Sequence, residues 1–193
     1  QMNVYYKYFF DTLGENDRDK IFLEILSYFN NSSLNILEIG TTRRLEINGN
    51  NPVKAGDGMS TLFWCDYINK NKGKLVVNDI SLEAIANCKK IISDFLDKID
   101  VNFIVDDGLN HISNEYDLIY LDAGDSIIEC LKQFEKIDKN KTSVLIDDGM
   151  TKAVLVKAKY KSYKSFKANE NHEMIFYPSL ELQSRLNINQ NIN

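Results

Sequence analysis

Short apolar runs and longer amphipathic stretches follow one another along the 193 residues of this chain. Each apolar run is rich in Val, Ile or Leu and stops at or beside an acidic residue or a glycine, as buried strands often do. Five such runs occupy residues 34–39, 74–80, 101–105, 116–122 and 142–148. They predict five strands buried on both faces of a sheet.

The stretches between these runs place apolar residues at helical spacing. In the first stretch, Ile21, Ile25 and Phe29 lie four residues apart, which brings them to one face of a helix. The helical stretches are 18–30, 59–70, 82–98 and 126–137. Strands that alternate with helices predict an α/β fold, with a mainly parallel sheet covered by helices on both faces.

The pattern changes after the fifth strand. Residues 150–160 have helical character, and the following segment has aromatic residues on both sides of the polar stretch 169–173, which predicts an antiparallel hairpin at the sheet edge. The low-complexity end, 186–193, is expected to fray. The predicted organisation is a helical lead-in (1–33), one domain (34–180) and a flexible tail (181–193).

Composition narrows the class of protein. A hydrophobic content of 44% suits one globular domain, and a net charge of −5 gives no long-range attraction to nucleic acid or anionic membranes. Three cysteines without metal-binding or CxxC spacing argue against a disulfide framework. With no signal peptide and no membrane-spanning run evident in the sequence, we expect a cytoplasmic protein. Its oligomeric state is left open, with a homodimer as one option.

Carboxylates cluster where the predicted strands end. The strands end in Glu38-Ile39-Gly40, Asn78-Asp79, Asp106-Asp107-Gly108, Asp122 and Asp147-Asp148-Gly149. Helix capping explains one such residue, whereas five at the same edge of a parallel sheet indicate a ligand site. An acidic rim repels phosphates and attracts a cation, which argues against NAD and ATP. Asp79 is in the position to accept hydrogen bonds from ribose hydroxyls.

The ordered motifs "LEIG", "GDGMSTL", "VVNDIS", "FIVDDGLNHI", "YDLIYLDAGDS" and "VLIDDG", over residues 34–150, resemble those of class I S-adenosylmethionine-dependent methyltransferases. The resemblance implies a Rossmann-like methyltransferase fold, S-adenosylmethionine as cofactor and a methyltransferase activity. It implies that Gly40 and Thr41 line the methionine part of the cofactor, that Asp79 holds the ribose, and that Asp107 and Gly108 meet the adenine. The other expected cofactor contacts are Glu38, Gly58, Ser60, Ile80 and Asp122.

The glycine loop after the first strand is interrupted. Thr41, Thr42, Arg43 and Arg44 follow Gly40, and glycines return only at 56–58. We interpret this as a split loop in which Gly58 supplies the close approach, and in which Ser60, in the first turn of the next helix, receives the cofactor carboxylate. Residues 41–55 would form a polar excursion at the mouth of the site. Its two arginines either meet an anionic group or are solvated.

Asp122, Asp147 and Asp148 resemble the divalent-metal ligands of small-molecule O-methyltransferases. That resemblance implies a Mg²⁺ ion that holds an acceptor hydroxyl and lowers its pKa, with Asp122 and Asp147 as the catalytic pair. Asp148 stands where Asn is commoner, and Asp125 stands where catechol-type relatives carry a lysine, so the general base is left open. Alternatively, Asp147 and Asp148 cap the next helix, and Asp122 only lines the cofactor pocket.

The remaining polar features have simpler readings. His111 is expected to pack or face solvent near the adenine, while His172 lies in the predicted hairpin turn, where it either reaches the acceptor or has no substrate role. Six lysines between Lys152 and Lys167 are read as a solvated helix face rather than as a phosphate-binding patch.

The leading hypothesis is a methyltransferase that acts on a hydroxyl of a small molecule, with Mg²⁺ assistance as an option. A cofactor-binding protein without methyl transfer is the first alternative. An aminopropyl-transferase or hydroxylase-like use of the same scaffold is the second.

Overall fold

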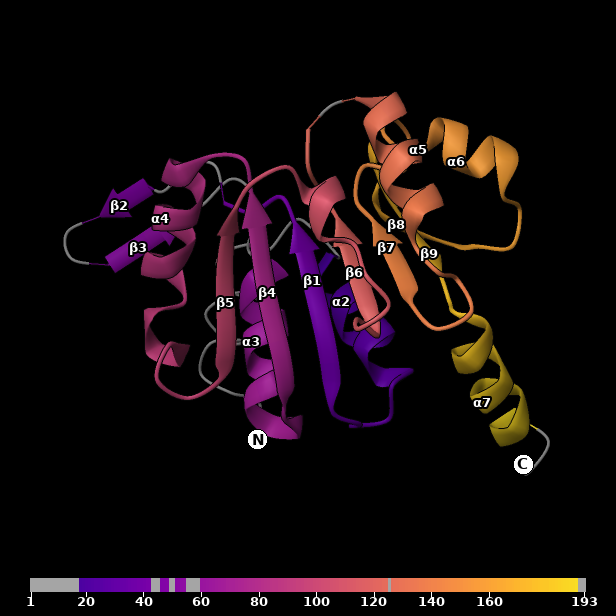
Figure 1. Cartoon of the computed structure of the whole chain (residues 1–193), viewed down its shortest axis with the longest axis horizontal. Helices are drawn as coiled ribbons and strands as arrows, with labels where there is room; N and C mark the ends of the chain where they lie inside the picture. Colours follow the sequence, from indigo (N-terminus) through magenta and orange to yellow (C-terminus); the bar gives the residue numbers. More distant parts are fainter. Residues whose placement is uncertain (1–17, 43–45, 49–50, 55–59, 125, 191–193) are drawn as a thin grey trace.

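A computed structural model describes residues 18–42, 46–48, 51–54, 60–124 and 126–190. In these residues a seven-stranded sheet has the order β5-β4-β1-β6-β7-β9-β8 (Figure 1). The parallel strands are β1 (Leu34–Ile39), β4 (Gly73–Asp79), β5 (Asp100–Val105), β6 (Leu118–Leu121) and β7 (Ser143–Ile146). β9 (His172–Tyr177) runs antiparallel to both β7 and β8 (Lys164–Asn169). This arrangement confirms the predicted sheet and its C-terminal hairpin.

Two hydrophobic clusters cover the two faces of the sheet, because alternate residues of each buried strand point to opposite sides. On one side, Ile36 and Leu75 pack with α2 (Arg18–Ser27), α3 (Ser60–Asn71) and α4 (Leu82–Ile91). On the other side, Leu37 and Val76 lie in a cluster with α5 (Ile127–Lys136) and α6 (Val154–Lys159). Two short 3₁₀ turns, η1 (Ser93–Phe95) and η2 (Gly108–His111), follow α4 and β5.

The chain leaves β1 for β4 on one side, and β6 lies on the other side of β1. Such a point of reversal in a parallel sheet opens a crevice at the carboxyl ends of the strands, where ligands bind. In Figure 1 the arrows of β5, β4 and β1 point to one common edge. The carboxylates predicted at the strand ends therefore meet at this edge.

Serine side chains fix where two of the helices begin. Ser81 accepts a hydrogen bond from the Ala84 N–H at the start of α4, and Ser126 accepts one from the Glu129 N–H at the start of α5. Both are N-caps, which satisfy backbone donors that a helix leaves free in its first turn. They set the two helix starts beside the carboxyl edge of the sheet.

One expectation needs correction, and two further segments have more secondary structure than the sequence pattern indicated. The helix expected over 150–160 begins only at Val154. The predicted tail is helical up to Gln190 in α7 (Leu180–Gln190), because Ser179 caps it and Leu182, only 1% exposed, anchors it. Part of the predicted polar excursion forms a two-stranded hairpin of β2 (Glu46–Asn48) and β3 (Asn51–Lys54).

Within the described residues, every helix is too short or too polar to cross a lipid bilayer.

Candidate active site

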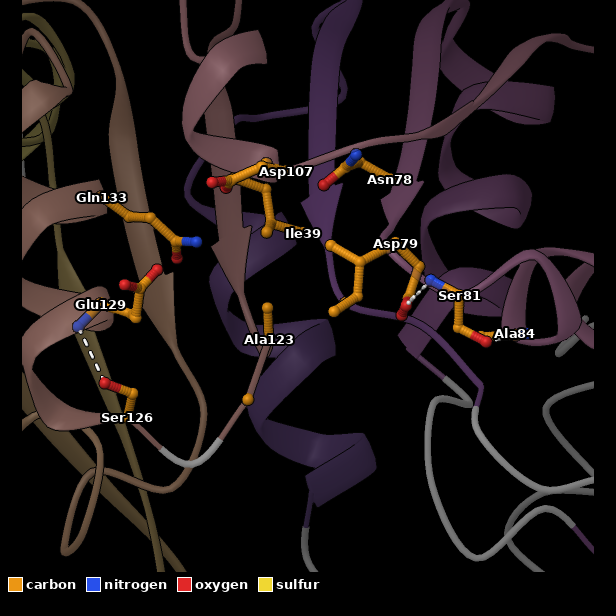
Figure 2. Close-up of a pocket in the computed structure, with 14 residues that line it drawn as sticks. Ile39, Asn78, Asp79, Ser81, Ala84, Asp107, Ala123, Ser126, Glu129 and Gln133 are labelled. Atoms are coloured by element: carbon orange, nitrogen blue, oxygen red, sulfur yellow. Dashed lines mark hydrogen bonds between the residues drawn. The ribbon is translucent and has the colours of Figure 1, made fainter.

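A cavity of about 590 Å³ lies at the carboxyl ends of β1 and β4 and is bounded on its other side by α5. Its volume suits a small organic ligand. Figure 2 shows Asp79, Ser81 and Ala84 on one side of this pocket, facing Glu129 and Gln133 on the other, with Ile39 between them. The pocket occupies the place that the sequence predicted for a cofactor.

Asp79 is held in the pocket wall by two backbone donors. The Ser81 N–H donates to Asp79 Oδ1 (2.8 Å), and the Thr41 N–H donates to Asp79 Oδ2 (2.9 Å). A carboxylate has about four acceptor positions, so two remain for a ligand after these bonds. Asp79 is therefore fixed in orientation and keeps acceptor positions for a ligand.

Ile80, next to Asp79, also lines the pocket and is 78% exposed. An apolar side chain this exposed in a pocket wall is suited to cover a flat apolar ring. Asp107 and Gly108 line the same cavity at the end of β5. Asp107 caps the η2 turn by accepting a hydrogen bond from the Leu109 N–H. All three residues lie where the sequence placed them.

Two glycines allow the backbone to come close around the pocket. Gly40 has a φ of +87°, and a Cβ there would lie 2.6 Å from the carbonyl carbon and oxygen of Asp122. At Gly108 a Cβ would lie 2.4 Å from Ile39 Cγ2 and 2.7 Å from Asn78 Oδ1. Neither position has room for a side chain, so both glycines are required by the fold of this edge.

Asn78, which lines the pocket and is 1% exposed, carries an unsatisfied acceptor. Its Nδ2 donates to the carbonyls of Ile104 and Asp106, whereas its Oδ1 has no hydrogen-bond partner among the described residues. Buried polar atoms in native proteins nearly always have a partner. A donor on a bound ligand would complete this one.

The side of the pocket formed by α5 and its N-cap was not predicted from the sequence. Ser126, Glu129 and Gln133 all line it, because positions three and four residues apart share one face of a helix. This spacing of polar residues was visible in the stretch predicted to be α5. Ala123 and Gly124, which directly follow the predicted Asp122, complete the wall.

Three predicted cofactor contacts, Glu38, Thr41 and Ser60, are buried and absent from the pocket lining that the structure describes. Glu38 Oε2 accepts hydrogen bonds from Ser60 Oγ (2.8 Å) and Trp64 Nε1 (2.6 Å), and Thr61 Oγ1 donates to Glu38 Oε1. These side chains join the start of α3 to β1. Thr41 supports Asp79 through its N–H, as described above, while Gly58, Arg43 and Arg44 lie outside the described residues.

Glu38 is an unusual carboxyl group because it is fully buried. Burial raises its pKa to about 7, although the hydrogen bonds from Thr61 and Ser60 oppose the shift. Its position at the end of the first predicted strand predicts contact with the cofactor. In β1, however, Glu38 lies between Val77 and Tyr120 of the neighbouring strands, and its side chain points to the α3 face.

A second group of charges lies at the ends of β6 and β7, on the other side of Gly40 from Asp79. Asp122 Oδ1 is 2.9 Å from Lys152 Nζ. Asp147 Oδ2 is 2.8 Å from Arg18 Nη2, and Asp147 Oδ1 is 2.6 Å from His172 Nε2. We call Arg18, Asp122, Asp147, Asp148, Lys152 and His172 the charged cluster.

The carboxyl groups of the charged cluster differ in pKa. Burial and the nearby Asp147 charge raise the pKa of Asp122 to about 7, although Lys152 opposes this shift. Burial also favours the neutral form of Asp147, but the hydrogen bond from His172 and the charge of Arg18 outweigh it and lower the pKa of Asp147 to about 2. Two neighbouring carboxyls whose pKa values are driven apart are typical of a functional site.

Lys152 is an exception to the prediction of a solvated face for the lysine-rich segment, in which Lys159, Lys161, Lys164 and Lys167 are exposed. Its side chain is only 5% exposed, and Lys157 forms an ion pair with Glu173 (2.6 Å). Arg18 gave no signal in the sequence beyond opening the first helix, because its partners are more than a hundred residues away. His172 was placed in a turn, whereas it is the first residue of β9 and reaches Asp147.

His111, the other histidine, lies on η2, outside both groups. Its Nε2 is 2.7 Å from Asp106 Oδ2. This contact agrees with the expectation of a packing role near the adenine side.

The pocket and the charged cluster meet at Asp122. The Asp122 N–H donates to the Ile39 carbonyl (2.8 Å), its peptide lies against Gly40, and Ala123 after it lines the pocket. Its side chain points instead to Lys152. A ligand in the pocket that reaches the ends of β1 and β6 therefore comes next to the charged cluster.

Comparison with known proteins bears on the fold. No protein-family model matches the chain, and no curated protein matches its sequence. Among solved structures, an S-adenosylmethionine-dependent O-methyltransferase from Thermotoga maritima superposes with a TM-score of 0.57 over 81% of this chain, at 12% identity. The chain has the class I methyltransferase fold.

Two further structures share this fold. The ribosomal protein L11 methylase of Lactobacillus delbrueckii gives a TM-score of 0.56 at 10% identity, covering 82% of this chain and 76% of its own. A methyltransferase from Geobacter sulfurreducens gives 0.52 at 10% identity, covering 83% and 76%. The chain spans 63% of the Thermotoga protein. At these identities the likeness establishes the methyltransferase fold, and function has to be argued from the site.

Proposed function

We propose that this protein is an S-adenosylmethionine-dependent methyltransferase that transfers a methyl group to a hydroxyl of a small molecule. The observation that carries the proposal is the pocket itself. An acidic residue held by two backbone donors, an exposed isoleucine and an unpartnered buried amide oxygen line one cavity at the switch point of a methyltransferase fold. NAD and ATP fit this wall poorly because it offers carboxylates to their phosphates.

The pocket residues fit the parts of this cofactor. Asp79 would accept from the ribose hydroxyls, and Ile80 would cover the adenine. Asp107 and Gly108 would lie at the adenine edge, where Gln133 and the Asn78 amide oxygen are further polar partners. Gly40 leaves space beside Asp122 for the methionine part.

The bound cofactor would supply an electrophilic methyl group on its sulfonium. In this reaction the acceptor oxygen would form a bond to the methyl carbon, the carbon–sulfur bond would break to give S-adenosylhomocysteine, and the hydroxyl proton would pass to a base of the charged cluster and then to solvent. The charged cluster offers carboxylates and an imidazole toward that proton. Holding the two reactants in line is the main contribution of the protein to such a reaction.

Magnesium assistance, expected from the sequence, is not part of this proposal. Lys152 and Arg18 lie where the carboxylates would meet an ion. The same contacts favour one alternative, a protein that binds the cofactor without methyl transfer, because they also occupy the carboxylates nearest the acceptor.

Calorimetric titration followed by a transfer assay tests the proposal. We expect S-adenosylmethionine and S-adenosylhomocysteine to bind with micromolar dissociation constants, and ATP and NAD not to bind. A panel of hydroxylated small molecules with methyl-labelled cofactor should then yield a labelled product and S-adenosylhomocysteine. Tight binding without label transfer to any hydroxyl would favour the alternative, and no binding at millimolar cofactor would reject both.

A further inference from the structure

The charged cluster contains more fixed positive charge than a metal site allows. Arg18 Nη2 is 2.8 Å from one Asp147 oxygen, and His172 Nε2 is 2.6 Å from the other. Lys152 Nζ is 2.9 Å from Asp122 Oδ1 and 3.5 Å from Asp148 Oδ2. With His172 Nδ1 at 3.4 Å from Asp148 Oδ1, most of the carboxylate oxygens already face a nitrogen.

One subset of these residues has the spacing of a metal site. Donor atoms of Asp147, Asp148 and His172 lie within 4.8 Å of one another. Both oxygens of Asp147 already face a nitrogen, however, so an ion bound at a remaining lone pair of this carboxylate would lie beside the Arg18 guanidinium. A divalent ion at this place would be repelled by Arg18 and Lys152 unless one of these cations moved away.

Charge counting leads to the same conclusion. The three carboxyl groups contribute at most three negative charges and Arg18 with Lys152 contributes two positive ones, so the cluster carries at most one net negative charge. Adding a divalent ion without losing a cation would give a net positive charge in a largely buried cluster. Removing charges from water makes such an excess costly.

The position of Lys152 is fixed by the backbone. Asp148 has a φ of +50°, and its carbonyl accepts hydrogen bonds from the N–H groups of Thr151 (3.0 Å) and Lys152 (2.9 Å). This turn returns the chain so that Lys152 Nζ reaches both Asp122 and Asp148. The Lys152 side chain is thus placed by a backbone turn and is itself only 5% exposed.

We propose that Arg18 and Lys152 occupy the place that a divalent ion takes in metal-assisted O-methyltransferases, and that this protein works without a metal. The proposal that no metal binds depends only on the contacts of Arg18 and Lys152 with the carboxylates. The further step, that Lys152 supplies the positive charge beside the acceptor oxygen, rests on the proposed function. Lys152 is then a positioning residue: it neutralises the charge of Asp122 and Asp148 at the acceptor side of the pocket.

Paramagnetic resonance of Mn²⁺ tests this on the metal alone, because the sharp signal of the free ion is lost on binding. We expect the full chain, with and without S-adenosylmethionine, to leave the signal unchanged up to millimolar Mn²⁺. Lys152→Met removes the cation shared by Asp122 and Asp148 and should tighten Mn²⁺ binding at least about tenfold. Lys159→Met is the matched control, because Lys159, the last residue of α6, pairs with an exposed Glu135 and lies outside the charged cluster. It should behave as wild type.

Arg18→Met removes the other cation and should also tighten Mn²⁺ binding, so it replaces Lys152→Met if that variant does not fold. Thermal unfolding checks that each variant is folded. Micromolar Mn²⁺ binding by the wild type that Asp147→Asn abolishes would overturn the proposal. Folded Lys152→Met and Arg18→Met proteins that bind no more tightly than the wild type would overturn it as well. If the wild type fails to bind S-adenosylmethionine, the proposed function is rejected. The Mn²⁺ measurements still test the metal proposal, because they do not need the cofactor.

Discussion

Gly40 lies against the peptide of Asp122, so closely that a Cβ on Gly40 would be 2.6 Å from the Asp122 carbonyl carbon. This contact joins the end of β1 to the end of β6 and separates the cofactor pocket from the charged cluster. Asp122 also donates its N–H to the carbonyl of Ile39, the residue before Gly40. The two strand ends are therefore locked together at the point where the two parts of the site meet.

Gly40→Ala should destabilise the protein by about 2–4 kcal/mol, because it adds strain at a positive φ to a clash with backbone. Gly124→Ala is the matched control. Gly124 also lines the pocket and has a positive φ of +62°, but its nearest neighbour to a Cβ is 4.0 Å away, so about 1–2 kcal/mol is expected. Denaturant unfolding measures both variants, and equal losses would show that the contact with Asp122 is unimportant.

Asp79→Asn should weaken S-adenosylmethionine binding by at least about tenfold, since a charged acceptor contributes about 1.5–3 kcal/mol to a hydrogen bond. The new amide group would also face one of the N–H donors of Thr41 or Ser81, which now bond the carboxylate. Asp106→Asn removes a carboxylate that pairs with His111 and does not belong to the pocket lining described here. In calorimetry, Asp106→Asn should bind S-adenosylmethionine as tightly as the wild type. A similar loss of affinity in both variants would show that net charge, and not contact with the ribose, explains the effect.

Much of the pocket could be predicted because it depends on local pattern. Asp79 ends β4 and Gly108 comes three residues after β5, two strands with clear apolar runs, and a parallel sheet brings such ends to one edge. The orientation of a side chain at a strand end was less predictable. Glu38 alternates to the opposite face of β1 from its neighbours Leu37 and Ile39, and a one-residue change in phase turns a pocket contact into a buried anchor.

The charged cluster depends on long-range contacts, which a single sequence does not reveal. Lys152 lies in a segment rich in lysine, and nothing in its composition separates a buried lysine from an exposed one. Arg18 meets Asp147 across 129 positions of sequence. The sequence shows Asp125 where catechol-type relatives carry a lysine. The lysine that contacts Asp122 is Lys152, which comes from the turn after β7.

The buried Glu38 should make stability depend on pH. Its pKa is raised from 4.5 to about 7 in the folded protein, so the folded state binds a proton that the unfolded chain has already lost. The contribution of Glu38 to the free energy of unfolding is fully present below about pH 4.5. This free energy falls by about 3 kcal/mol as the pH rises through 7. Glu38→Gln keeps the shape without titrating.

Denaturant unfolding at several pH values between 4.5 and 8 measures this contribution as the difference between Glu38→Gln and the wild type. The variant should gain about 3 kcal/mol relative to the wild type across this range. Asp122, whose pKa is also raised to about 7, stays in both proteins and cancels in the difference. Parallel pH profiles would show that Glu38 is already ionised at pH 5.

A crystal structure of the protein with S-adenosylhomocysteine tests most directly the central claim, that this pocket holds the cofactor. We predict electron density in the cavity between Asp79 and Gln133, with the ribose hydroxyls on the Asp79 carboxylate, the adenine over Ile80 and the sulfur near Gly40. Density at another place, or an empty cavity at saturating ligand with the same fold, would contradict the assignment of this pocket to the cofactor.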